Sequence, residues 1–567
     1  MNPYLAVFLC AAGFTLAVAV MIIRAEHKRK KSIMRKIRRI YGQVPEREYE
    51  TGDIERISTY FRGKQSEGFY IDDITWNDLD MDRVFMMVNQ TISSPGEDVL
   101  YDMMRRPLFS KEKVQEREAL IEFFAQETEK REKIQFLLSS VGKTKLGSLS
   151  ETVLAIRNAP KVNPKIHIFM LVLLLLTLFI AVPASPLYGF FLFLVLGVAN
   201  MMIYYASKDY KLIEMYLDSF VSLLRMLSAA DKMETVDWAE TKKQMDAIRD
   251  GKKAFGGLRK KAVFLTGKND GTGDFLQAIL DYVRMVFHVD ILAYNSILRE
   301  VGDKTDKIIE MIDNMGELDA AISIASFREM LLLKCMPEFT DGQEVRLEVE
   351  DLYHPLISEP VANSISVQGG VLVTGSNASG KSTFLKNIAI NAILAQTLCT
   401  CTAGAYKAPF LKVMTSMALR DDLSGGESYF IVEIKSLKRI LDESKTKEPL
   451  LCIIDEVLRG TNTIERIAAS SRILKELAQP HVLPFAATHD IELSYILNGI
   501  YKNYHFEEEV LENEVVFNYL LKSGRATTRN AIRLLEMLGY DKTLVEDAGR
   551  AAADFEQTGV WKMLKEQ

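Results

Sequence analysis

A glycine-rich loop between an apolar run and a helical pattern could bind phosphate. Residues 375–383 read Gly-Ser-Asn-Ala-Ser-Gly-Lys-Ser-Thr, after the apolar residues 371–373 and before a helical pattern that includes Phe384 and Ile388. This fits G-x-x-x-x-G-K-[ST], in which backbone N–H groups and the dipole of the following helix face the anion. A chance glycine loop is the alternative, but partner residues follow downstream. We therefore expect a nucleotide site formed by Gly375, Ser376, Asn377, Ala378, Ser379, Gly380, Lys381, Ser382 and Thr383.

The residue types in this loop indicate what each of them would do with a bound nucleotide. The Lys381 ammonium would hold the β- and γ-phosphates, and the Ser382 hydroxyl would ligate Mg²⁺. Gly375 and Gly380 would let the backbone turn tightly enough to wrap the anion. The expected cofactors are therefore ATP and Mg²⁺.

Two downstream apolar runs end in residues suited to phosphate chemistry. Residues 450–454 lead into Asp455 and Glu456, as in a parallel strand buried on both faces. Asp455 suits the Mg²⁺ shell and Glu456 could polarise the attacking water, although both could be solvated charges at a strand end. Residues 483–487 lead to His489. A histidine there could sense the γ-phosphate, although a lone histidine is more often structural.

The segment between these motifs narrows the class of ATPase. Residues 421–433 begin Asp-Asp-Leu-Ser-Gly-Gly-Glu-Ser-Tyr-Phe and end at Glu433. Leu-Ser-Gly-Gly-Glu is similar to the signature loop of ABC transporters, but only 48 residues (423 − 375) separate it from the phosphate loop, too few for a transporter's helical subdomain. The segment and its spacing instead resemble the ATPase domain of the MutS mismatch-repair family. Residues 353–357, 455–463 and 486–489 continue this resemblance.

The resemblance implies a site shared between two subunits. In the MutS family, the serine at the position of Ser428 reaches the γ-phosphate on the other subunit, so a homodimer is implied. The alternative is that Ser428 only caps the helix that follows it. Two residues depart from the family pattern: Val361 stands about where the family places an adenine-stacking aromatic, and Tyr353 replaces the usual Arg before His-Pro.

Composition limits what the rest of the chain can do. With 567 residues the chain should hold several domains, and its net charge of −6 gives no global attraction to nucleic acid, so any DNA contact must be local. The five cysteines include no C-x-x-C pair and lie in apolar or helical contexts. They are typical of reduced thiols, and we assign them no metal or redox role.

The first apolar run is long enough to cross a membrane. Residues 5–23 carry no charge and would form a helix of about 28 Å. A cleaved signal peptide is the rival, but the flanks are reversed, because residues 24–39 carry nine Lys or Arg. The positive-inside rule then places the amino terminus outside and the basic segment in the cytoplasm. That segment is better placed to contact anionic lipid than DNA.

Two further apolar runs, residues 166–182 and 187–205, flank a Pro-Ala-Ser-Pro turn. A buried core hairpin is the alternative, but the length, the lack of charge and the Tyr204-Tyr205 pair favour a membrane hairpin. Basic residues both before and after the hairpin place its two ends in the cytoplasm. We therefore expect a multi-pass cell-membrane protein with three spans, an outside amino terminus and a cytoplasmic ATPase domain.

Helical patterns fill the remaining chain, and their residue order resembles the helical core and lever of MutS proteins. The space before residue 76 is too short for a mismatch-reading domain, and the end of the chain resembles the helical pair that joins MutS ATPase domains. We divide the chain into a first membrane helix (1–23), a basic juxtamembrane segment and linker (24–75), a first helical core part (76–165), a membrane hairpin (166–205), a second helical core and lever part (206–345), a P-loop ATPase domain (346–525) and a helical dimerisation tail (526–567).

These expectations combine into one fold and two main functions. The fold is an ABC-like α/β P-loop ATPase domain, a parallel sheet flanked by helices, with an all-α lever domain and transmembrane helices. In the first function a dimer hydrolyses ATP to move lever arms on DNA, as in mismatch repair or branched-DNA binding. In the second the same levers move a protein partner at the membrane without DNA. An ABC-type transporter ATPase is the third reading, which the spacing and the small number of spans disfavour.

Overall fold

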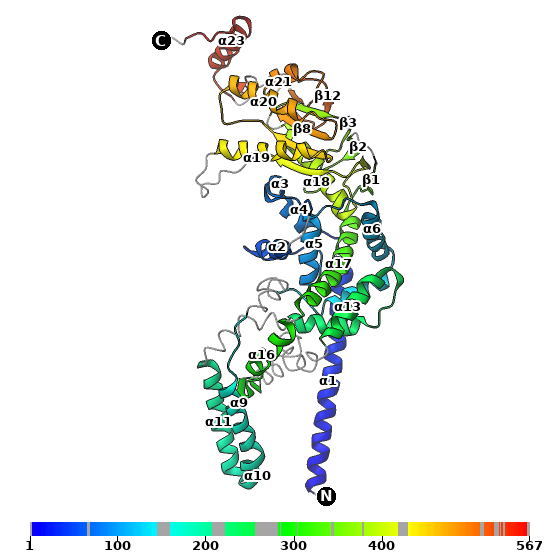
Figure 1. Cartoon of the computed structure of the whole chain (residues 1–567), viewed down its shortest axis with the longest axis vertical. Coiled ribbons are helices and arrows are strands. Elements are labelled where there is room, and N and C mark those ends of the chain that lie inside the picture. The colour runs from blue at the N-terminus through cyan, green and yellow to red at the C-terminus, as the bar shows by residue number, and fades with distance from the viewer. Residues whose placement is uncertain are drawn as a thin grey trace. The chain divides into compact units, whose positions relative to one another are not determined.

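The protein folds into two compact units (Figure 1). The first contains Met1–Gly68, Phe85–Arg106 and Glu112–Leu331, and the second contains Phe69–Val84, Pro107–Lys111 and Leu332–Gln567. The computed structural model describes residues 3–64, 68–144, 159–206, 222–255, 282–283, 285–302, 304–341, 345–376, 379–417, 429–510, 515–526, 532, 535–536 and 539–563.

The second unit is built on a six-stranded sheet. From edge to edge its strands are β12 (Lys522–Ser523), β9 (Tyr501–His505), β4 (Gly370–Thr374), β8 (Val482–Thr488), β7 (Leu450–Asp455) and β6 (Lys412–Ser416). The five strands from β9 to β6 run parallel, and only β12 pairs antiparallel. Every residue of β4 and β8 is buried, because both faces of the sheet are covered. The three strands predicted around the nucleotide site are confirmed.

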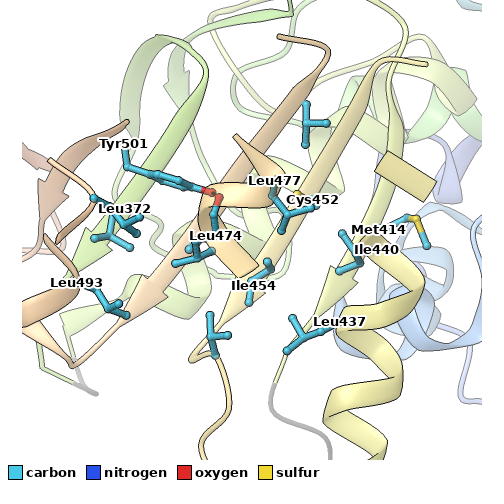
Figure 2. Close-up of a cluster of buried hydrophobic side chains, with 14 of the residues drawn as sticks. Leu372, Met414, Leu437, Ile440, Cys452, Ile454, Leu474, Leu477, Leu493 and Tyr501 are labelled. Carbon is cyan, nitrogen blue, oxygen red and sulfur yellow. Dashed lines mark hydrogen bonds between the residues drawn. The ribbon is translucent and has the colours of Figure 1, made fainter. Parts of the chain in front are cut away.

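Helices cover this sheet and share a core with it (Figure 2). One face of β7 packs against α19 (Tyr429–Glu443) and α20 (Thr463–Leu477), in a cluster that includes Leu437, Ile440, Cys452, Ile454 and Leu474. The alternate side chains of β7, Leu451 and Ile453, are equally buried on the opposite face, and α18 (Lys381–Leu398) also contacts β7. At the edge of the cluster the Tyr501 hydroxyl donates to the Leu474 carbonyl at 2.7 Å. This packing fixes the strand ends that carry the site.

A second, smaller sheet was not among the expected elements. Its order is β1 (Glu338–Phe339), β5 (Ala405–Ala408), β2 (Arg346–Leu352) and β3 (Asn363–Gln368). Most of β3 alternates between buried and exposed side chains, as in a sheet with one wet face. A hairpin of β10 (Glu508–Val510) and β11 (Val515–Phe517), the helix α21 (Ile491–Ile496) and the carboxyl-terminal helix α23 (Lys542–Thr558) complete the unit. The last of these confirms a helix in the predicted tail.

The division of the chain differs from the expected boundaries at 76 and 345. Residues 69–84, which include α3 (Asp73–Asp78), group with the α/β unit. The reason is a buried polar contact, because the Asp78 carboxylate accepts hydrogen bonds from the Thr415 hydroxyl at 2.6 Å and the Met417 N–H at 3.0 Å. The α/β unit also begins earlier than expected after the long helix, at Leu332.

The first unit is helical, as predicted, and α5 (Ser94–Arg105) packs against α17 (Thr305–Met330). A Cβ on Gly316 would lie 2.4 Å from the Pro95 carbonyl oxygen, so only glycine lets the two helices meet there. The buried Asp319 carboxylate accepts the Ser93 N–H at 2.8 Å just before α5. Other helices are α1 (Pro3–Ile40), α2 (Asp53–Gly63), α4 (Met81–Val88, which spans the boundary between units), α6 (Lys111–Gln126), α7 (Thr128–Leu138), α13 (Lys242–Ala254) and α16 (Val289–Gly302).

The predicted hairpin forms two apolar helical stretches. The first contains α9 (Lys165–Leu176), a π-helical turn (Thr177–Ala181) and α10 (Val182–Ala184), and the second is α11 (Pro186–Ala206). By length and composition both could cross a membrane, with mean hydropathies of 2.7 and 2.0. Only 22% and 17% of these windows are buried within the protein, unlike core helices of a soluble protein. The predicted first span falls within α1, but most of its side chains lie outside the described part.

Candidate functional site

The predicted phosphate loop joins β4 to α18. Gly375 has φ 143° and Gly380 has φ 100°, and a Cβ on Gly375 would lie 2.6 Å from the Phe506 carbonyl oxygen. The buried Lys381 ammonium donates to the carbonyls of Gly375 and Ser376, both at 2.7 Å. Burial lowers the pKa of Lys381 to about 8, against the opposing pull of Asp455 and Glu456. The described part of the loop is thus folded around the Lys381 ammonium. Asn377 and Ala378 lie outside the described residues.

The neighbouring strands deliver the other predicted residues to the same edge. β8 pairs with both β4 and β7, and the register sets Thr374 opposite Thr488 and Asp455 opposite Ala487. The Nε2 atom of His489 lies 2.8 Å from Glu456 Oε1 and 3.5 Å from Lys381 Nζ. The parallel sheet therefore brings Lys381, Glu456 and His489 together, although more than a hundred residues separate the first from the last.

Glu456 is held as a carboxylate in a constrained backbone. Its φ is 58°, which is unusual for a residue other than glycine, and its N–H donates to the Ala487 carbonyl at 2.9 Å. Burial alone would raise its pKa, but hydrogen bonds from His489 and Arg459 lower the pKa of Glu456 to about 2. An ionised carboxylate at this position can accept a hydrogen bond from a water molecule.

Glu433 and Arg459 belong to this site, although the sequence analysis assigned them no role. Glu433 on α19 accepts the N–H of Leu458 at 2.5 Å and that of Arg459 at 3.3 Å. Leu458 has φ 60°, so the turn that begins at Glu456 contains two left-handed residues, Glu456 and Leu458. The Ser470 hydroxyl fixes the same turn by donating to the Val457 carbonyl at 3.1 Å. Glu433 is the last residue of the motif at 421–433. Its place in that motif is the sequence feature that could have identified it as part of the site.

A cavity of about 430 Å³ adjoins the phosphate loop and could hold a base. It contains Val361, the residue that departs from the family pattern, but also Tyr519. A Cβ on Gly380 would lie 3.1 Å from the Tyr519 ring, which stacks on Phe517 with a 25° interplanar angle. The cavity is lined by His354, Ile357, Glu359, Pro360, Val361, Asn363, Gly380, Ser382, Thr383, Phe384, Asn387, Phe506 and Tyr519. Sequence reasoning missed Tyr519 because it is remote from the loop along the chain.

The expected magnesium ligands offer suitable donors. Ser382 lies in the first turn of α18 and Asp455 at the end of β7, near enough to Lys381 to act on its pKa. A hydroxyl and a carboxylate are hard oxygen donors, which Mg²⁺ takes together with substrate phosphates. No cluster of three or more His, Cys, Asp or Glu that could hold a metal occurs among the described residues, so phosphate oxygens and water would complete the shell. Ser428 lies outside the described part, which resumes at Tyr429.

A parallel sheet with a glycine loop after one strand and a carboxylate pair after a neighbour defines the class of P-loop nucleotide-binding proteins. Residues 371–556 match the family model of MutS domain V. The chain is 28% identical over 296 residues to "DNA mismatch repair protein MutS" of Leptospira interrogans, covering 49% of this chain and 34% of that protein. It is 29% identical over 285 residues to human "MutS protein homolog 4", covering 47% and 30%.

A further relative is the "DNA mismatch repair protein MutS" of Thermus thermophilus, with 32% identity over 208 residues, 36% of this chain and 25% of that protein. Through this region the chain is similar to MutS proteins. It spans about a third or less of the length of these curated relatives.

Proposed function

We propose that this protein binds and hydrolyses Mg²⁺-ATP at the edge formed by β4, β7 and β8. The observation that carries the proposal is the convergence of Lys381, Glu456 and His489, with Nε2 of the histidine 2.8 Å from the carboxylate and 3.5 Å from the ammonium. Lys381 would leave its loop carbonyls for the β- and γ-phosphates. Glu456 would orient and polarise the attacking water. His489, which lies beside both Lys381 and Glu456, would sense the γ-phosphate.

Mg²⁺ would supply charge neutralisation at the phosphates, held by Ser382 and Asp455. The protein's own residues bind the triphosphate, order the water and accept its proton. Tyr519 is the aromatic surface beside the loop on which an adenine could stack, in place of Val361. ATPase activity of the purified chain, measured as phosphate release with and without Mg²⁺, tests this proposal. Absence of ATP binding by the wild-type protein would reject it.

The active unit in this proposal is a homodimer in which Ser428 acts in trans. Lys381, Glu456 and His489 cover one side of the γ-phosphate, and a hydroxyl from a facing subunit would stabilise charge on the other side. Inactive Ser428→Ala and inactive Lys381→Ala subunits can be mixed to test it. Partial recovery of activity is expected, because some heterodimers carry one intact site. Mixtures that stay inactive although heterodimers form would reject the trans role of Ser428.

A membrane anchor of three spans would place the α/β unit, and the parts of the helical unit outside the spans, in the cytoplasm. Two of the spans are the apolar stretches Lys165–Ala184 and Pro186–Ala206, and the third is the run at 5–23. The basic residues 24–39 would then contact anionic lipid. Protease added outside right-side-out vesicles should spare nearly the whole chain, and ready cleavage of the α/β unit would reject this topology.

We propose DNA as the object on which the helical levers act. Support comes from two of the relatives, each of which is named a DNA mismatch repair protein. The apolar hairpin favours a second candidate, in which the levers move a protein partner at the membrane. Phosphate release in detergent over a salt series separates the two. Stimulation by a DNA structure that survives physiological salt supports the first, and indifference to all DNA supports the second.

A further inference from the structure

Two cysteines that are far apart in the sequence face each other in the α/β unit. Cys335 and Cys401 form an isolated antiparallel bridge, in which the Cys335 N–H donates to the Cys401 carbonyl at 3.1 Å and the Cys401 N–H donates back at 3.0 Å. Residues paired in this way have Cα atoms about 5.5 Å apart. Disulfides span Cα distances of about 4.4–6.8 Å. The backbone therefore already holds the two residues at bonding distance.

The two thiols differ in the way that an attacking and a resolving thiol differ. Cys335 is partly exposed, whereas Cys401 is fully buried beside it. A hydrogen bond with the Cys401 side chain lowers the pKa of Cys335, and burial opposes this only in part. The remaining described cysteines, Cys399 and Cys452, are fully buried, and burial raises the pKa of Cys452 well above its usual range. A small oxidant therefore meets Cys335 first.

The surroundings hold Cys401 in place. The next residue, Thr402, donates its N–H to the Asn391 side-chain oxygen at 2.7 Å and its hydroxyl to the Tyr353 carbonyl, also at 2.7 Å. Asn391 belongs to α18, the helix that begins at Lys381. Cys335, by contrast, follows the end of α17 at Met330 and meets this rigid segment through the two hydrogen bonds of the bridge. The two hydrogen bonds thus hold the segment around Cys335 against the segment around Cys401 within the α/β unit.

We propose that Cys335 and Cys401 are a redox modification site, at which a small-molecule disulfide converts two thiols into an intramolecular disulfide. The Cys335 thiolate attacks one sulfur of the oxidant, forming a mixed disulfide and expelling one thiolate. The Cys401 thiol then loses its proton and attacks the Cys335 sulfur, expelling the second thiolate. The oxidant gains two electrons and two protons and leaves as two thiols, so the exchange balances. The reduced thiols expected from composition are the starting state.

The bond would tie the chain leaving α17 to the end of the helix that carries the phosphate loop. Two hydrogen bonds can open and close during an ATP cycle, but a disulfide cannot. This consequence rests on the proposed ATPase function. We expect the oxidised protein to bind ATP as before and to lose turnover in proportion to the fraction of molecules that carry the bond, with full recovery in dithiothreitol.

The test uses the full-length protein in detergent, titrated with oxidised glutathione and digested without reduction. A linked peptide pair containing Cys335 and Cys401 is expected by mass spectrometry. In Cys401→Ser the reaction should stop at a glutathione adduct on Cys335, and Cys335→Ser should form neither product. Cys452→Ser is the matched control and should still form the bond. If oxidised glutathione leaves wild-type protein with a stable adduct on Cys335, or links Cys335 to another cysteine, the proposed Cys335–Cys401 site is rejected.

Peptide mapping needs no ATPase activity, so the site and the proposed function can fail separately. If the bond forms but wild-type protein does not hydrolyse ATP, only the function is rejected. If hydrolysis is normal but oxidised glutathione never links the pair, only the site is rejected. Because Cys401 is buried, thermal unfolding of Cys401→Ser is compared with wild type, and the variant at the partly exposed position, Cys335→Ser, decides the result if Cys401→Ser is unstable.

Discussion

Two carboxylates, one in each unit, have their pKa lowered by different kinds of partner. Glu97 on α5 is completely buried among cations, with Arg56 at 2.7 Å, Lys143 at 2.8 Å and Arg47 in contact. Burial would raise its pKa, but these three cations lower the pKa of Glu97 to about 2. Glu456, whose pKa is also about 2, keeps 14% of its side chain exposed at a strand end beside the phosphate loop.

A depressed pKa therefore does not by itself mark a functional residue. The partners of Glu97 come from α2 and from segments near residues 47 and 143, so the carboxylate joins pieces of the helical unit. The partner of Glu456, His489, also approaches the phosphate-loop lysine, and the backbone at Glu456 has φ 58°. Access to solvent, an exchangeable partner and a constrained backbone distinguish the site from the structural cluster.

The largest expected effect separates the two residues by turnover. Glu456→Gln should lower ATP turnover by about 10²–10⁴-fold, because the amide cannot accept the proton of the attacking water. ATP binding should remain, because Glu456 is not among the residues proposed to hold the phosphates. Phosphate release and equilibrium ATP binding are measured on the same preparation.

Lys381→Ala is the control for that experiment, since it should lose phosphate binding itself. If Glu456→Gln turns over at the wild-type rate, Glu456 is not the water-activating residue. Glu456 would then no longer differ from Glu97 by a role in catalysis.

The reverse result is expected at Glu97. Glu97→Ala leaves three cations without their shared carboxylate, and removing one partner of a buried ion cluster costs about 3–5 kcal/mol. Hydrogen exchange of α5 in detergent should show the loss of protection, with the α/β unit unaffected. Glu46→Ala is the matched control, because its ion pair with Arg39 is exposed on both sides. Equal destabilisation by both variants would mean that the cluster is not what holds these segments.

Part of the fold and of the site could be predicted from the sequence, and part could not. The loop at 375–383, the strands that end at Asp455 and Thr488, and the apolar hairpin are local patterns, and the structure contains each of them. Glu97, Arg47 and Lys143 carry no such pattern, because their meeting depends on helix packing. The small sheet escaped prediction in part because two of its pairs, β1 with β5 and β2 with β5, join residues far apart in the chain. Tyr519 and the Cys335–Cys401 bridge were missed for the same reason.

The pH dependence of stability tests the low pKa of Glu97, and its expected effect is somewhat smaller. The pKa of Glu97 is about 2 in the folded protein and 4.5 ordinarily, so its contribution is complete above about pH 4.5 and is lost as pH falls toward 2. A shift of this size corresponds to about 3 kcal/mol. The stability gap between wild type and Glu97→Gln should therefore shrink by about that amount as pH falls from 5 to 2. Urea unfolding of both proteins in detergent measures it, and a constant gap would contradict the low pKa.

Glu433 combines features of both carboxylates and gives the smallest predicted effect. It is buried like Glu97, yet it accepts the N–H groups of Leu458 and Arg459 in the turn after Glu456. A hydrogen bond to a charged group contributes about 1.5–3 kcal/mol. Glu433→Ala should free this turn and lower turnover by about tenfold or more while ATP binding is kept, because a misplaced Glu456 no longer aligns water.

Conservative replacement distinguishes positioning from simple stability. Glu433→Gln keeps an oxygen that can accept both N–H groups and should restore most of the turnover. Asp442→Asn is the matched control on α19, since that carboxylate is exposed and its partners Lys438 and Lys445 are also on the surface. If Glu433→Ala lowers ATP binding and turnover equally, or if Glu433→Gln is as slow as Glu433→Ala, the residue supports the fold as Glu97 does. A loss confined to turnover and rescued by glutamine means that α19, which directly follows the segment containing Ser428, also sets the position of Glu456.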